Sequence, residues 1–379
     1  MAIYADFNAT TKVSAAAKQA MEQALEAWGN PSSSHGSGRK ALELLEKSRL
    51  SVATSLQWDP FEVVFTSGGS EANGNVLLGS YFLQRDGFRL LTSKVEHSSL
   101  RDCVELLESL GVEVEYVPVL PSGALDWNAF TQKMAAFKPT LVSLMTANNE
   151  TGVLFPIPEI ATVCKAAGAK LHTDAVQAFG KISPTFFAEA DFVSVSAHKI
   201  FGPKGAGALR VKKGEKLIAT HYGGAQEVKR RGGTENIIGL AGFGAAAAEI
   251  SQEKDFAAVQ TLRDRFEALI LKNLTEVSIQ GADSLRIPNT SNIRFCGVPN
   301  EVLLGALDLE GICVSAGSAC SSGSISPSHV LLEMGLSKQE AKECVRFSFG
   351  KTTTEEEIDK LGQVVINHVN RVRTRRRNL

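Results

Sequence analysis

The sequence is poor in the features that mark membrane, secreted or metal-binding proteins. Its six cysteines are scattered through 379 residues, with no C-x-x-C pair and no zinc-site spacing. No hydrophobic run approaches the roughly 18 residues that a membrane-spanning helix needs. The first residues lack the basic and apolar regions of a signal peptide and the arginines of a transit peptide. We therefore expect a cytoplasmic chain with reduced cysteines that holds no metal and binds no membrane.

An excess of charge of either sign is also missing. The 40 lysines and arginines almost cancel the 41 aspartates and glutamates, and a net charge of -1 argues against a nucleic-acid binder. With 44% hydrophobic and 21% charged residues, the chain is typical of globular proteins, and at roughly 150 residues per domain it predicts two or three domains. Five arginines crowd the C-terminus, which we interpret as a solvated helix end, with partner docking as the alternative: Arg371, Arg373, Arg375, Arg376 and Arg377.

Strands and helices alternate over the first two thirds of the chain. Residues 14–28 predict a helix capped by Ser14 and stopped by Gly29, and residues 38–56 predict a second one. Apolar strands then alternate with helical stretches, which predicts a mostly parallel α/β sheet with helices on both faces and ligands beyond the carboxyl ends of its strands. The expected strands are 62–65, 89–93, 112–117, 141–145, 170–173, 192–196 and 208–211.

The pattern changes from about residue 236. An alanine-rich helical stretch leads into a charged helix at 253–273, then short strands near 277, 291–295 and 345–349, and a final amphipathic helix from about Thr354. This order predicts a smaller α+β domain. We expect residues 15–250 to form the large domain, and residues 1–14 with 251–379 to form the small one.

Residues 194–207 give the sharpest local signal. An apolar strand ends on Ser-Ala-His-Lys and enters a loop with three glycines and a proline. Burial at the end of that strand would favour the neutral, nucleophilic amine of Lys199. A solvated loop lysine is the alternative.

Asp174 closes another apolar strand, two residues after His172. A carboxylate in this position can hold a protonated heterocyclic nitrogen, as an aspartate does for the pyridinium of pyridoxal phosphate. A helix N-cap is the alternative for Asp174. A metal pair with His172 is disfavoured because no third ligand lies nearby in the sequence.

Three more groups follow strands. The glycine-rich turn in 66–73 precedes a helix, so its amides and hydroxyls can cradle an anion, although it is neither a Walker A loop nor G-x-G-x-x-G. His97 could stack on a planar ring or shuttle protons, unless it is a surface or hydrogen-bonded core histidine. Asn149 offers an amide. Together with Asp174 and Lys199, these groups predict one cofactor site.

Seven segments share a combined pattern that is far more specific than any one of them: 4–11 (YADFNATT), 29–35 (GNPSSSH), 66–73 (TSGGSEAN), 148–152 (NNETG), 196–207 (SAHKIFGPKGAG), 223–227 (GGAQE) and 231–236 (RGGTEN). Together they resemble the cysteine desulfurases, which are pyridoxal-phosphate enzymes of the class V aminotransferase group. The likeness extends from residue 4 to about 360. It implies a PLP-dependent transferase fold of the aspartate aminotransferase-like kind, fold type I.

The resemblance also implies roles for individual residues. Lys199 would form a Schiff base with pyridoxal phosphate, Asp174 would hold the pyridinium, and Gln177 would hold the phenolic oxygen. His97 would stack on the ring and help to move protons. The remaining cofactor contacts would come from Gly69, Ser70, Asn149, Ser196 and His198.

Thr234 would reach the phosphate of a neighbouring subunit, which implies a homodimer with shared active sites. The sequence departs from the usual family pattern at three places. Ser70 stands where threonine is usual and keeps the hydroxyl, Phe7 replaces an asparagine, and Ser98-Ser99 differ from the common residues after His97.

Cys320 decides between the reactions that this cofactor permits. It lies in a small, polar segment that is unlike a protein core and resembles the loop of the long-loop, group I desulfurases. An exposed thiolate there could approach a substrate and carry its sulfur away. The alternative, a buried structural cysteine, suits Cys164, Cys313 and Cys344, which lie in apolar patterns.

Arg346 lies between apolar residues at strand spacing. A partly buried arginine needs an anion, so it is either a substrate-carboxylate anchor, helped by Asn149, or a member of a structural salt bridge. The resemblance favours the anchor.

The activity that follows is removal of sulfur from L-cysteine. Lys199 or His97 would move the α-proton, the Cys320 thiolate would take the sulfur as a persulfide, and L-alanine would leave. An iron–sulfur scaffold or another acceptor protein would receive the sulfur. The alternatives are a selenocysteine lyase, another class V enzyme that needs a keto acid, and a non-catalytic sulfur-trafficking protein.

Overall fold

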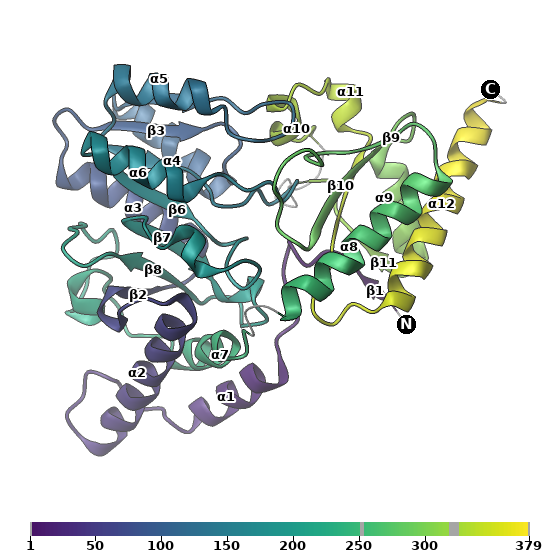
Figure 1. Ribbon diagram of the computed structural model, residues 1–379. Helices are drawn as coiled ribbons and strands as arrows, with labels where there is room; N and C mark the ends of the chain where they lie inside the picture. Colours follow the sequence, from purple (N-terminus) through teal and green to yellow (C-terminus); the bar gives the residue numbers. More distant parts are fainter. Residues whose placement is uncertain (1, 251–253, 318–325, 378–379) are drawn as a thin grey trace.

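A seven-stranded sheet forms the centre of the larger part of the molecule (Figure 1). The computed structural model describes residues 2–250, 254–317 and 326–377. The strand order is β2-β8-β7-β6-β5-β3-β4, and the four pairings from β4 to β7 are parallel, while β8 runs antiparallel to β7 and β2. The expectation of a mostly parallel sheet is confirmed. The strands are β2 (Val63–Thr66), β3 (Arg89–Ser93), β4 (Glu113–Val117), β5 (Leu141–Ser143), β6 (Lys170–Asp174), β7 (Phe192–Ser196) and β8 (Gly207–Val211).

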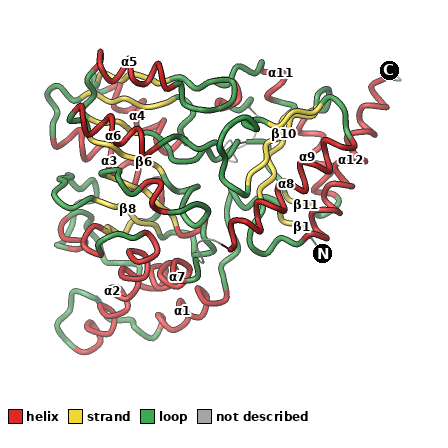
Figure 2. Tube along the Cα trace, viewed as in Figure 1, coloured by secondary structure: helices red, strands yellow, loops and turns green. Residues whose placement is uncertain are grey.

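Helices cover both faces of this sheet (Figure 2). Val64 of β2 packs with α3 and α4 on one face, whereas Val63 and Phe65 pack with α1, α2, α5, α6 and α7 on the other, as the alternation of strand side chains requires. Every residue of β7 and β8 is buried, including Ser194 and Arg210, as expected of strands that are covered on both faces. The helices are α1 (Ala15–Leu25), α2 (Gly36–Leu56), α3 (Gly69–Leu83), α4 (Ser98–Ser109), α5 (Trp127–Phe137), α6 (Ile157–Ala167) and α7 (Ile237–Ala248).

The first helix is shorter than its sequence predicted. Ser14 does cap α1 by accepting a hydrogen bond from the Ala17 amide, but the helix ends at Leu25 rather than at residue 28. Trp28 is 81% exposed, so no packing extends the helical face to that residue. Short 3₁₀ turns also connect the elements of this part of the chain: η1 (Pro60–Glu62), η2 (Pro184–Phe187), η3 (Ala197–Lys199) and η4 (Gln226–Lys229).

A second, smaller layer lies beside the large sheet (Figure 1). Its three antiparallel strands follow the order β12-β10-β9, and helices α8 and α12 pack against each other over a core in which Phe266 meets Phe347 at a ring distance of 4.8 Å. A parallel pair, β1 with β11, joins the chain's start to this layer. The elements are β1 (Ile3–Tyr4), α8 (Lys254–Asn273), β9 (Val277–Ile279), β10 (Thr290–Phe295), α9 (Asn300–Leu309), β11 (Ile312–Cys313), α10 (His329–Glu333), α11 (Lys338–Ala341), β12 (Cys344–Ser348) and α12 (Glu355–Arg377).

The core of this layer includes Ile3 and Ala5 together with residues from 259 to 369. Leu331 and Cys344, by contrast, pack into the core cluster of the large sheet. The domain boundaries at residues 14/15 and 250/251 stay a prediction. Among the described residues, no helix is both long enough and apolar enough to cross a membrane.

Two expectations from the sequence are corrected by side-chain placement. Cys313 is exposed, not buried, because β11 pairs only with β1 and its second residue faces outward. Arg373 is not a solvated end residue. Its guanidinium donates to the backbone oxygens of Thr275, Glu276 and Cys296. It therefore joins α12 to the residues just before β9 and to the residue just after β10. Arg371, two residues earlier, is exposed as expected.

Candidate active site

A cavity of about 790 Å³, its open mouth included, lies where β6 and β7 end and α3 begins. The parallel strands β5 and β6 and the following β7 bring their carboxyl ends to this edge, as the sequence predicted. Nine of the predicted site residues line this one cavity, whereas Thr234 and Arg346 do not. The nine are Gly69, Ser70, His97, Asn149, Asp174, Gln177, Ser196, His198 and Lys199.

Lys199 lies in the η3 turn that joins β7 to the antiparallel β8. Its side chain is half-buried, and its Nζ donates to the backbone oxygens of Asn8 and Ala9, the latter at 2.9 Å. The alternative of a solvated loop lysine is therefore wrong. The N-terminal segment crosses the site and holds the amine in place.

Asp174 ends β6 and is 8% exposed. Its Oδ1 accepts a hydrogen bond of 2.9 Å from the Val176 amide, and its Oδ2 accepts one of 2.7 Å from Asn73 Nδ2. Both bonds fix the orientation of the carboxyl group. No helix begins at Asp174, so the N-cap alternative is wrong, although the bond to Val176 is the local turn contact that a cap would also make.

His172 is a hydrogen-bonded core histidine rather than a metal ligand. Its Nδ1 lies 2.8 Å from Ser143 Oγ and its Nε2 lies 3.0 Å from Ser194 Oγ. Complete burial lowers the pKa of the imidazole to about 3, so the ring is neutral at pH 7.

His97 caps α4 and lines the cavity. Burial lowers the pKa of its imidazole; the carboxylate of Asp174 opposes this shift, and the charge of Lys199 adds to it. The Ser99 amide donates to Nδ1 at 3.1 Å. Because Nδ1 accepts this bond, the proton of the neutral ring is on Nε2. Burial and the charge of Lys199 also lower the pKa of His198, to about 4.

The turn before α3 forms the predicted anion cradle. Gly68 has a φ of 157°, and α3 starts at Gly69 with its first amides free of helical partners. A Cβ on Gly69 would lie 2.7 Å from Val176 Cγ2, so only glycine keeps this wall open. Glu71 accepts bonds from the Ser67 amide and from Arg231 Nε, both at 2.8 Å, and so ties the turn to the segment that leads to Thr234.

These residues fit pyridoxal phosphate. The cradle suits a phosphate, the Asp174 carboxylate suits a protonated pyridine nitrogen, and the Lys199 amine suits an aldehyde. The neutral ring of His97 at the same cavity suits stacking on a planar group.

Arg346 is 2% exposed and contacts Asn149, one of the residues that line this cavity. Its Nη2 forms an ion pair of 2.8 Å with Asp6 Oδ1, and its Nη1 donates to the backbone oxygen of Asn149 at 3.0 Å. The structural salt bridge therefore exists. Arg346 Nε has no hydrogen-bond partner among the described residues, so the guanidinium keeps capacity for another anion. Its role as substrate anchor stays a prediction.

Sequence reasoning missed several residues that hold the site. Asn73, which binds Asp174, ends segment 66–73, but that segment was interpreted only as an anion cradle. Asp6 and Asn8 lie in segment 4–11, which carried the resemblance but gave no sign of their contacts. Lys181 lies four residues after Gln177, and its Nζ binds Gln177 Oε1 at 2.6 Å.

Cys320 lies outside the described residues, and its role stays a prediction. The described residues on either side meet at Glu150, the neighbour of Asn149. Ser328 Oγ donates to Glu150 Oε2, and a Cβ on Gly317, whose φ is +97°, would lie 2.8 Å from the same oxygen. Both ends of the segment that carries Cys320 are therefore next to the site.

Comparisons with known proteins agree with this geometry. The family model for class-V aminotransferases matches residues 3–361. A cysteine desulfurase IscS from Dictyoglomus turgidum is 40% identical over 98% of this chain and 95% of its own. The solved structure of a NifS-like protein from Rickettsia africae is 32% identical with a TM-score of 0.87 over 98% of this chain and all of its own. SspA in complex with cysteine is 30% identical with a TM-score of 0.82 over 93% of this chain and all of its own. The chain belongs to the class-V aminotransferase family and, within it, to the pyridoxal-phosphate-dependent cysteine desulfurases.

Proposed function

We propose that this chain removes the sulfur of L-cysteine, releases L-alanine and keeps the sulfur as a persulfide on Cys320. The observation that carries the proposal is the meeting of Lys199, Asp174 and His97 around one cavity, with both ends of the Cys320 segment beside it. A relative named for its complex with cysteine supports the same substrate.

Pyridoxal phosphate, when bound, supplies an electron sink for the bonds around the substrate's α-carbon. The residues of this chain do the rest. Asp174 would hold the pyridine nitrogen protonated, Lys199 would bind the cofactor and could take the α-proton of the substrate at Nζ, and His97 could donate a proton from Nε2. Gly69, Ser70, Ser196 and His198 would hold the phosphate, Gln177 would hold the phenolic oxygen, and Asn149 would be a further cofactor contact.

Arg346 anchors the carboxylate of the substrate in this proposal. Its two outer nitrogens are held by Asp6 and Asn149, which fixes the plane of the guanidinium before substrate arrives. Arg346→Lys keeps the charge and loses that plane. We expect it to raise the KM for cysteine by about tenfold or more while leaving cofactor content unchanged.

The protein acts as a homodimer in this proposal, with Thr234 of each chain at the phosphate of the other. Thr234 is exposed and lines no part of its own cavity. Near it lies a hollow lined by Leu42, Phe61 and Val228, of which Phe61 is 80% exposed. Val228 has a φ of +55°, which is costly for a β-branched residue unless neighbouring groups hold it. A second copy of the chain that covers this hollow would supply the contacts that keep Val228 in this backbone conformation.

An iron–sulfur scaffold is the acceptor that the name of the Dictyoglomus relative supports, and a cytoplasmic location accords with the scattered cysteines. Selenocysteine lyase activity is the alternative. An assay without any keto acid separates these functions. The proposal expects alanine from cysteine, together with sulfide when an added thiol reductant supplies the two electrons that release sulfide from the persulfide. A selenocysteine lyase would release alanine much faster from selenocysteine, and an aminotransferase would release neither product without a keto acid.

A further inference from the structure

Lys181 is a buried lysine that the proposed reaction does not use. It is 8% exposed and forms no ion pair with any carboxylate of the described residues. Its Nζ instead makes two hydrogen bonds to neutral amides, one of 2.6 Å to Gln177 Oε1 and one of 3.1 Å to Asn8 Oδ1. A buried charged group usually has a charged partner, so this arrangement needs another explanation.

The two bonds match a neutral amine, which has two N–H groups. Burial lowers the pKa of Lys181 well below its ordinary value, and the charges of Lys199 and Arg346 add to the shift. The neutral form leaves no buried charge and no buried N–H without a partner. Lys181 is thus suited to hold neighbouring dipoles in place without placing a further cation beside Lys199.

Its contact with Gln177 determines which way that amide faces. Oε1 accepts from Lys181, and Nε2 donates at 3.0 Å to the backbone oxygen of Asn8, the oxygen that also accepts from Lys199. The NH₂ end of Gln177 is therefore on the Lys199 side of the site, and the oxygen end is on the far side. If the amide were flipped, its oxygen would face the backbone oxygen of Asn8, which can only accept, and the N–H of Lys181 would lose Oε1 as its acceptor.

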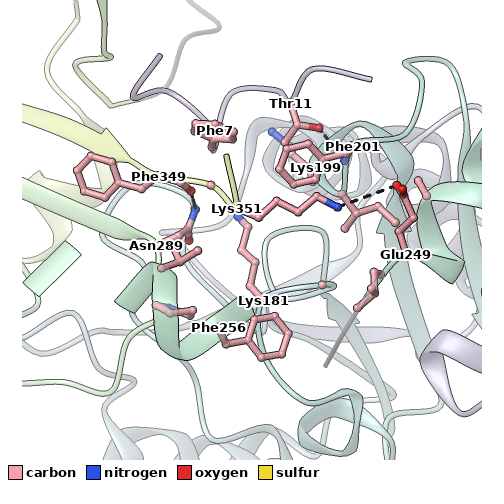
Figure 3. Close-up of a pocket in the computed structure, with 17 residues that line it drawn as sticks. Phe7, Thr11, Lys181, Lys199, Phe201, Glu249, Phe256, Asn289, Phe349 and Lys351 are labelled. Atoms are coloured by element: carbon pink, nitrogen blue, oxygen red, sulfur yellow. Dashed lines mark hydrogen bonds and ion pairs between the residues drawn. The ribbon is translucent and has the colours of Figure 1, made fainter. Parts of the chain in front are cut away.

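The second contact fixes the partner amide in the same way. Asn8 Oδ1 accepts from Lys181 and from Asn289 Nδ2, while Asn8 Nδ2 donates to Thr290 Oγ1 at 2.8 Å and to the backbone oxygen of Asn149 at 3.1 Å. Lys181, Lys199 and Asn289 line a second cavity (Figure 3), of about 620 Å³ with its mouth included, which shares Lys199 with the cofactor site.

We propose that Lys181 is a positioning residue of the cofactor site: it holds the oxygen of Gln177 away from the cavity, so that Gln177 presents only N–H donors to the phenolic oxygen of the cofactor. This inference rests on the proposed role of Gln177. A donor to that oxygen stabilises the form of the cofactor that has lost its bridging proton. Loss of the donor therefore raises the pH at which the visible absorption band of the bound cofactor changes.

The test is a double-mutant cycle on the loaded protein. Lys181→Met keeps the volume and removes both N–H groups, and Gln177→Ala removes the amide. We expect each single variant to move the pH midpoint of the band upward by about one unit, the size that one hydrogen bond accounts for. The double variant should match Gln177→Ala alone, because Lys181 acts through that amide.

Lys351→Met is the matched control. Lys351 lines the cavity of Figure 3 but lies 4.0 Å from Glu249 and over the Phe201 ring, with no contact to Gln177 or Asn8. Its midpoint should equal that of the unmodified protein. Two results would overturn the proposal. One is a pH midpoint that Lys181→Met leaves unchanged. The other is a shift from Lys181→Met that is as large in the Gln177→Ala background as in the unmodified protein. No shift in Gln177→Ala would instead remove the role of Gln177 on which it rests.

A crystal structure of the loaded, unmodified protein tests the same geometry should Lys181→Met not fold. We expect Lys181 Nζ within about 3.2 Å of the Gln177 side chain, on the side opposite the cofactor. A separation beyond hydrogen-bond distance would contradict the proposal.

Discussion

Asp174 is held in place by two donors from the protein itself, the Val176 amide and Asn73 Nδ2. The side chain that a pyridinium needs is therefore oriented before the cofactor binds, which is the preorganisation that makes such groups effective. The strand pattern of the sequence predicted Asp174 and Lys199, because both follow apolar strands. It could not predict that Arg346 pairs with Asp6, since 340 residues separate them and no local pattern links them.

Replacing Asp174 by asparagine should lower turnover by on the order of 10²-fold or more, because the ring nitrogen loses its negative partner. Asn73→Ala is the control, since it removes one donor to Asp174 and leaves the charge. We expect Asn73→Ala to lower the turnover rate much less than the asparagine variant of Asp174 does. Steady-state rates of alanine release measure both, and equal losses would show that the charge of Asp174 is not what matters.

His172 makes stability depend on pH. Its pKa is about 3 in the fold and 6.5 as a free imidazole, so only the unfolded chain takes up a proton between these values. Stability is complete above about pH 6.5 and falls on acidification, by up to about 1.4 kcal/mol per pH unit for this group. Denaturant unfolding gives the free energy of unfolding at each pH between 5 and 6.5. The slope of this free energy against pH should fall by about one proton in His172→Gln. An unchanged slope would mean that His172 is not buried as a neutral ring.

At the scale of elements, the cradle depends on close contact between the turn before α3 and strand β8. A Cβ on Gly207 would lie 2.7 Å from Gly68 Cα and 2.8 Å from the Val195 oxygen, both of them backbone atoms that cannot move aside. The sequence marked the turn as a possible anion cradle from its glycines. It could not show that a glycine of another strand keeps the turn in place, because this contact arises only when β8 pairs with β2.

Gly207→Ala should therefore displace the Gly68 turn, lower the free energy of unfolding by about 1–3 kcal/mol and weaken cofactor retention. Gly305→Ala is the matched control. Gly305 lies in α9 with open space around it, so alanine there should be neutral or stabilising by about 1 kcal/mol. Thermal unfolding and cofactor content after dialysis measure both variants, and normal retention in Gly207→Ala would contradict this account of the cradle.

At the scale of the whole molecule, the N-terminal segment joins the two layers at the site. Asn8 binds Lys199 and Gln177 of the large-sheet part and Thr290 and Asn289 of the small layer. The sequence predicted both layers from their strand and helix patterns. The hydrogen bonds by which Asn8 joins the two layers could not be predicted, because its partners come from segments far apart in the chain.

The proposed homodimer with shared active sites makes a prediction of its own. Thr234→Asp should repel the phosphate of the partner's cofactor, and Lys199→Ala should remove the covalent attachment. A mixed dimer of the two variants has one site with both changes and one with neither. Co-expressed, separately tagged chains purified as mixed dimers should regain about half of the normal activity, whereas each variant alone should stay inactive. Inactive mixed dimers would mean that each site is built from a single chain.

The central claim is that Cys320 takes the sulfur from a cysteine bound at the cofactor site, and a single-turnover reaction of Cys320→Ala with L-cysteine tests it most directly. The loaded variant should keep the visible absorption of the cofactor and change it on binding cysteine, while alanine release and protein-bound persulfide both fall below detection. Normal alanine release from this variant would contradict the account.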